Sequence, residues 1–398
     1  MLPSSLPICE RTLRAVLLDR ARQYPIVTVT GPRQSGKTTL CRSAFPQLPW
    51  VSLEAPDVRA QAVEDPRGLL RQYPDGALID EVQRAPELLS YLQDDVDRRT
   101  EVRGRWILTG SHNLLLLKAV SQSLAGRTAV LNLLPLALQE LPAAWLHDLP
   151  WTHLALAGGY PGPLHRGIPL EIWLGDYVAT YLERDVRDVL RVADLRSFER
   201  FVRLCAGRSG QLLNLASLGA DAGIAHSTAK AWLSVLEATF VTFMLQPWSA
   251  NLTTREVRSP KLFFWDTGLL CWLLGIRRAE DVALHPLRGA IFENMVAVEL
   301  LKHDLHRGRR PQWWFYRDAK GLEIDFVQVD GLRVRGMEVK SGETLQQAWA
   351  DPLRTWRERL MERGQDPQMA VVYGGEGRGA VRGAEGLPWR GIGEWLER

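Results

Sequence analysis

The 398-residue sequence predicts an α/β protein in which a parallel-sheet domain comes first and a second α/β domain comes last. Two observations predict this order. Short apolar runs at residues 26–28, 77–79 and 106–108 each end in polar residues, as do parallel strands that carry a ligand site at one edge. Residues 313–340 instead alternate between apolar and polar positions, which is typical of antiparallel strands.

Length and composition place the chain among folded proteins of several domains. Hydrophobic residues make up 46% of the sequence and charged residues 24%, which are ordinary values for globular proteins. No apolar run reaches the roughly 20 residues that a membrane-spanning helix needs, and the N-terminus lacks the order of a signal peptide. The four cysteines have no metal-ligand spacing. A cytoplasmic protein without a membrane partner is therefore expected.

The first apolar run leads into the sequence GPRQSGKTT, which fits the pattern GxxxxGK[ST]. Glycines in this pattern let successive backbone N–H groups surround a phosphate. A helix that begins at Lys37 directs its positive end at the same phosphates, while the Thr38 hydroxyl binds Mg²⁺. ATP and Mg²⁺ are therefore the expected cofactors. The predicted nucleotide-binding residues are Gly31, Pro32, Arg33, Gln34, Ser35, Gly36, Lys37, Thr38 and Thr39.

The second and third apolar runs supply the remaining catalytic groups. The second ends in Asp80 and Glu81. Asp80 is expected to hold the magnesium ion through water, and Glu81 to polarise the attacking water. The third run ends in TGS, where Ser111 is expected to sense the γ-phosphate. Together with Lys37, these residues predict a nucleoside triphosphatase.

The motifs GPRQSGKT, LIDEVQ, ILTGS, SLAGRTAVLNLLPLALQEL, GGYPGPL and DYVATYLERDV closely resemble, in this order, a widespread prokaryotic family of AAA-type ATPases. The resemblance covers essentially the whole chain. It implies a ring or stacked homo-oligomer, of which a hexamer is one form, in which an arginine of a neighbouring subunit completes the site. Arg127 and Arg184 are the candidates, and a structural ion pair is the alternative role for each.

The middle of the chain is predicted to be helical. Residues 150–192 are expected to form a lid over the nucleotide. Three short amphipathic helices follow, with Asn214 and Ser227 as N-caps, and an apolar run then predicts a strand. These elements, at residues 198–206, 214–222, 227–238 and 240–245, match a helix-turn-helix with a wing.

The third of these helices would then present His226, Thr228 and Lys230 to DNA. The helix is mostly apolar and has a single lysine. A winged-helix fold used only for packing between domains is therefore the alternative.

The C-terminal region combines a helix containing Glu293 with antiparallel strands containing Asp325, Glu338 and Lys340. Residues i and i+2 of a strand share a face, so Glu338 and Lys340 point the same way, and a tight hairpin would bring Asp325 beside them. Two carboxylates there could hold Mg²⁺ or Mn²⁺, with Glu293 completing the metal ligands and Lys340 activating a water.

This arrangement resembles the PD-(D/E)xK nuclease superfamily, which implies binding or cleavage of DNA. A retained fold that binds DNA or protein without cutting is the alternative. The Gly-rich stretch GEGRGAVRGAEG near the C-terminus is expected to be a mobile loop.

These expectations divide the chain into four parts: residues 1–145 as the AAA-type core, 146–196 as the lid, 197–257 as a winged-helix-like domain and 258–398 as a nuclease-like domain. Two functions fit them. The first is ATP-driven remodelling of, or translocation on, branched or duplex DNA, which the abundance of arginine favours. The second is a regulatory switch with a catalytically inert docking domain, which the small net charge of +3 favours. Either way ATPase activity is predicted, and nuclease activity depends on the C-terminal site.

Overall fold

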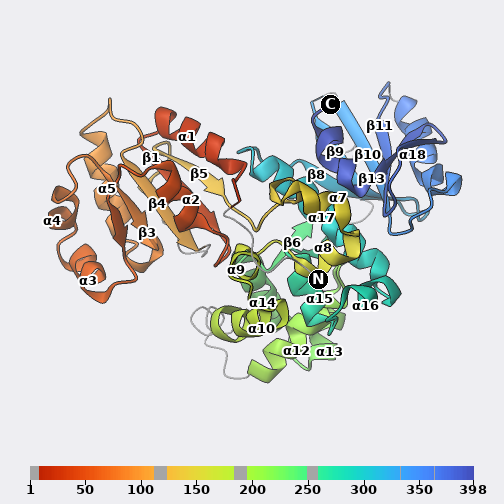
Figure 1. The fold of residues 1–398 in the computed structure, drawn as a ribbon, viewed down its shortest axis with the longest axis horizontal. Helices are drawn as coiled ribbons and strands as arrows, with labels where there is room; N and C mark the ends of the chain where they lie inside the picture. Colours follow the sequence, from red (N-terminus) through yellow and green to blue (C-terminus); the bar gives the residue numbers. More distant parts are fainter. Residues whose placement is uncertain (1–8, 112–122, 183–194, 249–258, 332, 363) are drawn as a thin grey trace.

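Two β-sheets lie at opposite ends of the long axis of the molecule, and a helical region lies between them (Figure 1). The computed structural model describes residues 9–111, 123–182, 195–248, 259–331, 333–362 and 364–398. Within these ranges, no helix has both the length and the apolar character needed to span a membrane.

The N-terminal sheet has five parallel strands in the order β2-β3-β4-β1-β5. Strands β1, β3 and β4 are buried along their whole length, because helices cover both faces of the sheet, and this explains their continuous apolar sequences. The strands are β1 (Ile26–Gly31), β2 (Trp50–Ser52), β3 (Ala77–Asp80), β4 (Trp106–Ser111) and β5 (Thr128–Asn132). The helices are α1 (Leu13–Gln23), α2 (Lys37–Ala44), α3 (Pro56–Glu64), α4 (Pro66–Arg71), η1 (Val82–Arg84) and α5 (Leu88–Asp97).

The register of this sheet places the predicted site at one edge. Gly31 at the end of β1 pairs with Ser111 at the end of β4, and Ile79 of β3 pairs with Leu108 of β4. Asp80 therefore follows at the same edge as Gly31 and Ser111. The parallel-sheet domain predicted from the apolar runs is confirmed.

The central region is helical, as expected, and its helices share a core with the C-terminal half, while their role as a lid stays a prediction. Trp151 and Tyr160 are buried in one continuous core with Phe292 and Trp313. The region comprises η2 (Leu138–Glu140), α7 (Ala143–Asp148), α8 (Trp151–Ala157), α9 (Pro161–Arg166), α10 (Leu170–Tyr177), η3 (Val178–Leu182), α12 (Leu195–Ala206), α13 (Leu215–Ala222), α14 (His226–Ala238), α15 (Thr267–Leu273), α16 (Ala279–Leu284) and α17 (Arg288–Leu305).

The expected winged-helix-like part has its three helices, α12 to α14, and an antiparallel pair of β6 (Thr242–Leu245) with β7 (Lys261–Phe264). Asn214 caps α13 by accepting the N–H of Ser217 at 3.0 Å, as predicted. The prediction for Ser227 is wrong, because α14 begins one residue earlier and Ala225 occupies the N-cap.

The C-terminal sheet has six strands in the order β12-β13-β11-β10-β9-β8. Strands β8 to β10 are antiparallel as predicted, whereas β11 runs parallel to β10. The Gly-rich stretch is not an unstructured loop, because it contains β12 and most of β13. The elements are β8 (Trp313–Arg317), β9 (Glu323–Asp330), β10 (Arg333–Lys340), η4 (Gln347–Ala350), α18 (Asp351–Met361), β11 (Gln368–Tyr373), β12 (Gly379–Val381), β13 (Ala384–Pro388), η5 (Trp389–Gly391) and α19 (Ile392–Leu396).

Candidate active site

The phosphate loop follows β1 and requires glycine at both ends of its pattern. Gly31 has a φ of +148°, and a Cβ there would lie 2.1 Å from the carbonyl oxygen of Leu133. Gly36 has a φ of +92° and caps the N-terminus of α2. Between them, Gln34 also has a positive φ of 63°. These turns let the loop curve back over the start of α2, where a helix N-terminus favours an anion.

Lys37 is the first residue of α2, and its ammonium group lies inside the loop. It donates hydrogen bonds to the carbonyl oxygens of Gly31 at 3.0 Å and Pro32 at 2.8 Å. Burial lowers the pKa of Lys37 to about 8, although Glu81 and Asp80 act in the opposite direction. A buried cation held only by neutral carbonyls is well placed to exchange them for phosphate oxygens.

Thr38 and Asp80 meet beside this cation. The Thr38 hydroxyl lies 3.0 Å from Oδ1 and 3.1 Å from Oδ2 of Asp80. The hydroxyl of Thr109, on β4, donates to the same carboxylate. A hydroxyl and a buried carboxylate that converge at the mouth of the loop are oxygen ligands of the kind that Mg²⁺ prefers, so these residues fit the expected ion.

Glu81 lies one residue beyond β3, at a φ of 58°. This left-handed conformation turns the backbone into η1, whose Gln83 donates to the carboxylate of Glu81 and, at 2.9 Å, to the hydroxyl of Ser111. The structure therefore brings Glu81 and Ser111 together through a residue that the sequence analysis missed. One indication of Gln83 was present in the sequence, because this residue follows Glu81 by two positions in LIDEVQ.

The residues predicted for this site also include Arg33, Thr39, Arg127 and Arg184. Arg33 is half-buried within the loop, and Thr39 is exposed on α2. Arg127 precedes β5 at the opposite edge of the sheet and binds Asp97 at 2.6 and 2.8 Å. It thus makes the structural ion pair that was the alternative, and a role in a neighbouring subunit stays a prediction. Arg184 lies outside the described residues.

The expected DNA-contacting residues lie together at the start of α14. His226 and Lys230 are exposed, and Thr228 is half-buried. The apolar residues of the same helix, including Trp232 and Leu236, are buried in the central core. The helix therefore has an outward polar face and an inward apolar face.

The four residues of the predicted nuclease-like site also converge. Strand register places Asp325 beside Glu338, and the Asp325 carboxylate accepts the N–H of Val339 at 2.8 Å. The Lys340 ammonium lies 2.7 Å from Glu338 and 3.8 Å from Asp325. Glu293 reaches the same place from α17.

A second lysine, absent from the prediction, occupies this cluster. Lys261 of β7 is buried and lies 3.0 Å from Glu293, 2.7 Å from Glu323 and 3.9 Å from Asp325. Nothing in the local sequence of Lys261 indicated this contact, since β7 is far from the other strands in the chain.

The two lysines and the carboxylates of this cluster form a network of ion pairs. Burial and the nearby Asp325 raise the pKa of Glu293 to about 7 and that of Glu338 to about 8. Within the described ranges, no group of three or more His, Cys, Asp or Glu side chains is arranged to hold a metal ion. With Lys261 between the carboxylates, the residues as placed do not fit the expected Mg²⁺ or Mn²⁺.

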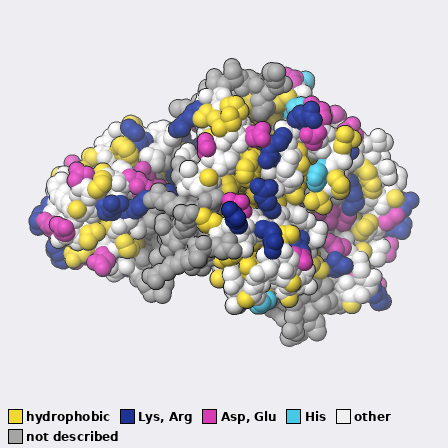
Figure 2. All heavy atoms as spheres, turned by 90° about the horizontal axis from the view of Figure 1, so that it is seen from below, with side chains coloured by type: hydrophobic (Ala, Val, Ile, Leu, Met, Phe, Trp, Pro, Cys, Tyr) yellow, Lys and Arg dark blue, Asp and Glu magenta, His cyan; other side chains and the backbone are white. Residues whose placement is uncertain are grey.

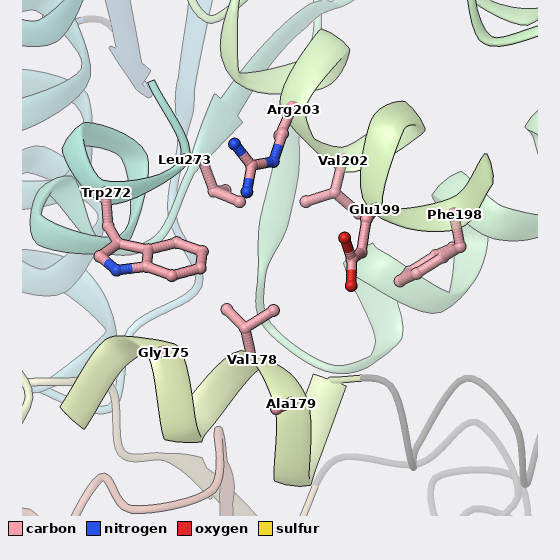
Figure 3. A pocket seen from close by; sticks show the side chains of 9 residues that line it. All are labelled: Gly175, Val178, Ala179, Phe198, Glu199, Val202, Arg203, Trp272 and Leu273. Atoms are coloured by element: carbon pink, nitrogen blue, oxygen red, sulfur yellow. The ribbon is translucent and has the colours of Figure 1, made fainter. Parts of the chain in front are cut away.

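A surface pocket of about 170 Å³ lies elsewhere, between the end of α10 and helices α12 and α15 (Figure 3). Trp272 lies on one side of it, and Arg203 and Glu199 on another. None of the predicted site residues lines it. Its walls belong to the central helical region, so it is separate from both candidate sites.

Comparison with known proteins matches the three regions of the chain separately. The model of an AAA domain matches residues 23–142, and models of two domains of unknown function, DUF8612 and DUF4143, match residues 150–280 and 288–388. The uncharacterized proteins Rv2008c of Mycobacterium tuberculosis and Mb2031c of Mycobacterium bovis are each 33% identical over 379 residues, covering 94% of this chain and 82% of theirs. The Walker-type ATPase PABY2304 of Pyrococcus abyssi is similar over 67% of this chain and 96% of its own, with 17% identity and a TM-score of 0.44.

Proposed function

We propose that this chain, which belongs to the same family as these two mycobacterial proteins and carries an AAA domain, uses ATP hydrolysis to drive action on DNA through the winged-helix-like region. The observation that carries the ATPase assignment is the contact of Thr38 with Asp80 next to the buried ammonium of Lys37. Lys37 and Thr38 begin α2, which follows β1 and the phosphate loop, and Asp80 is the last residue of β3, so these groups meet where the two parallel strands end at the same edge of the sheet.

Different residues of the site would bind the phosphates, hold the metal ion and activate the attacking water. The loop N–H groups and Lys37 would bind the β- and γ-phosphates. Thr38 and Asp80 would hold Mg²⁺, which neutralises charge on those phosphates when bound. Glu81 would orient and polarise the attacking water, and its hydrogen bond with Gln83 links it to Ser111, which would sense the γ-phosphate.

Variants at Lys37 and Glu81 test this division. Lys37→Ala should abolish binding of a fluorescent ATP analogue, because it removes the cation inside the loop. Glu81→Gln should retain that binding and lower turnover about a hundredfold or more, because the carboxylate that polarises water is lost. Glu87→Gln, at an exposed glutamate in the same segment, is the control. Turnover of the Lys37 variant near the parent rate would refute the assignment.

The proposed action on DNA is supported by the exposed His226 and Lys230 at the start of α14. The face in Figure 2 has Lys and Arg side chains interspersed with Asp and Glu, so a local contact fits the surface better than a broad basic one. Duplex and branched DNA should stimulate ATP turnover. His226→Ala with Lys230→Ala should remove most of this stimulation and leave basal turnover unchanged, whereas Arg98→Ala with Arg103→Ala, on the ATPase domain, should not.

A second function, a nucleotide-controlled switch with an inert C-terminal docking domain, is favoured by the position of Lys261. Its ammonium already neutralises Glu293 and Glu323, where a nuclease would place its metal ion. Calorimetric titration with Mn²⁺ and cleavage assays on branched DNA decide between the two. Cleavage that Asp325→Ala abolishes while ATPase activity persists would establish a nuclease. No cleavage, with Mn²⁺ binding gained only in Lys261→Ala, would establish the docking domain.

A further inference from the structure

Arg11 is a buried residue that joins the phosphate loop to the rest of the molecule. It precedes α1, and only 8% of its surface is exposed. Its guanidinium group donates to the carbonyl oxygens of Ser35 at 2.8 Å and Leu134 at 2.5 Å, and to the carboxylate of Glu140 at 3.2 Å. A rigid, planar fork of donors can satisfy three acceptors in fixed directions, which a lysine cannot do.

The bond to Ser35 controls the orientation of one peptide group in the loop. The carbonyl of Ser35 and the N–H of Gly36 belong to the same planar trans peptide, so they point in opposite directions. While Arg11 holds the carbonyl, the N–H faces away from Arg11. Gly36 itself has a φ of +92°, and a glycine imposes little preference on this plane. The hydrogen bond from Arg11 therefore fixes the orientation of this peptide group, which the backbone at Gly36 does not fix by itself.

Arg11 is in turn held by Glu140 and by the segment that follows β5. The Glu140 carboxylate accepts the N–H groups of Thr12 at 2.7 Å and Ala137 at 2.9 Å. Burial acts to raise the pKa of Glu140, but the charge of Arg11 and the hydrogen bonds from the N–H groups of Ala137 and Thr12 act in the opposite direction, and its pKa is lowered. The carboxylate is therefore charged and fixes the guanidinium in place.

Helix α17 of the C-terminal half holds this segment at three points. His306, just after the helix, accepts the N–H of Leu134 at 3.3 Å. Lys302 donates to the carbonyl oxygen of Leu136 at 2.7 Å. Glu299 accepts the N–H of Leu138 at 2.8 Å. Residues 299, 302 and 306 are spaced by three and four positions, so they share one face of the helix.

We infer that Arg11 is a positioning residue of the ATP site, and that α17 provides the support on which Arg11 depends. This inference rests on the proposed ATP site and adds that nucleotide binding there depends on Arg11 and on α17. Affinity for the nucleotide is then set partly by residues of the C-terminal half that never touch it.

Nucleotide affinity and hydrogen exchange test the inference in the full chain. Arg11→Lys keeps a positive charge beside Glu140 but cannot reach all three acceptors, and should raise the Kd for fluorescent Mg·ADP about tenfold. His306→Leu should raise it by a smaller factor, about threefold. Arg20→Lys, which alters an arginine that contacts Gln23 on the exposed side of α1, should leave it unchanged. Exchange at residues 31–38 should quicken in Arg11→Lys without nucleotide.

A measurement on the unaltered protein covers the case in which these variants fail to fold. Adding Mg·ADP should slow hydrogen exchange at residues 133–140 and 299–306. An unchanged exchange rate there, or unchanged Kd values in folded variants, would overturn the inference while leaving the ATP site intact. A parent protein that binds no nucleotide would instead overturn the proposed function.

Discussion

The ammonium group of Lys37 can gain or lose its proton near neutral pH, and the phosphate loop controls this. Burial lowers its pKa to about 8, and its partners are two carbonyl oxygens. Phosphate oxygens carry negative charge and would raise this pKa again. Binding of the nucleotide is therefore coupled to the protonation of one side chain.

This coupling predicts proton uptake on nucleotide binding. At pH 8 about half of the Lys37 side chains are neutral before nucleotide binds, so binding should take up about half a proton. Calorimetry in buffers of different ionisation enthalpy measures this number. Affinity should also fall as the pH rises above 8, and Lys37→Met should show no uptake in this range if any binding remains.

Glu338 gives a second pH dependence, this time of stability. Burial and Asp325 raise its pKa from 4.5 to about 8, so the folded state retains a proton that the unfolded state releases. The stability from this group is complete below pH 4.5 and is lost as the pH rises through 8. Glu338→Gln should therefore lose less unfolding free energy than the parent between pH 5 and 9, a difference of about 4 kcal/mol by denaturant titration. An identical pH slope in both proteins would contradict the shift.

At the scale of elements, the sequence was most informative where neighbouring residues alone determine the structure. The loop after β1, the acidic pair after β3 and the hairpin that joins Asp325 to Glu338 all follow from local patterns and strand periodicity. Lys261 could not be predicted, because its contacts depend on how β7 meets β9 and α17. Thr109 belongs to the predicted polar end TGS of β4, but its hydrogen bond to Asp80 was not among the predicted contacts.

Tertiary packing shapes two regions of the chain in ways that their local composition does not indicate. The expected lid helices carry Trp151 and Tyr160, and these large side chains complete a core shared with the C-terminal half. The Gly-rich stretch forms β12 and β13 because Val381 and Leu387 are buried against the sheet, even though glycine is unfavourable in strands. In both cases the distant partner was invisible in the local sequence.

Asn294 joins two elements and allows a direct test of this shared core. Its side chain, fully buried on α17, accepts the N–H of Phe264 at 2.8 Å and donates to the carbonyl oxygen of the same residue at 2.9 Å. Asn294→Ala leaves both backbone groups unpaired, which should cost about 2–4 kcal/mol of unfolding free energy. Gln365→Ala, at a half-buried amide, is the control. Equal melting curves would show that the contact contributes little.

At the scale of the whole molecule, the predicted homo-oligomer would place a second subunit against the ATP site. Arg127 is held by Asp97 within its own chain, so a role across subunits requires that pair to open. Glu81→Gln retains ATP and should therefore shift the protein to a larger assembly in light scattering with Mg·ATP. Lys37→Ala should remain small under the same conditions. A monomer in both variants would remove the support for a ring.

Helix α17 also limits how the protein can be divided for study. Leu134, Leu136 and Leu141 are buried in the core that α17 shares, although they directly follow the ATPase sheet. A fragment that ends at residue 142, where the match to the AAA domain ends, would leave these leucines in water and Glu140 without His306. Such a fragment should aggregate and bind nucleotide poorly. A lack of ATPase activity in this fragment would therefore not show that the intact protein lacks it.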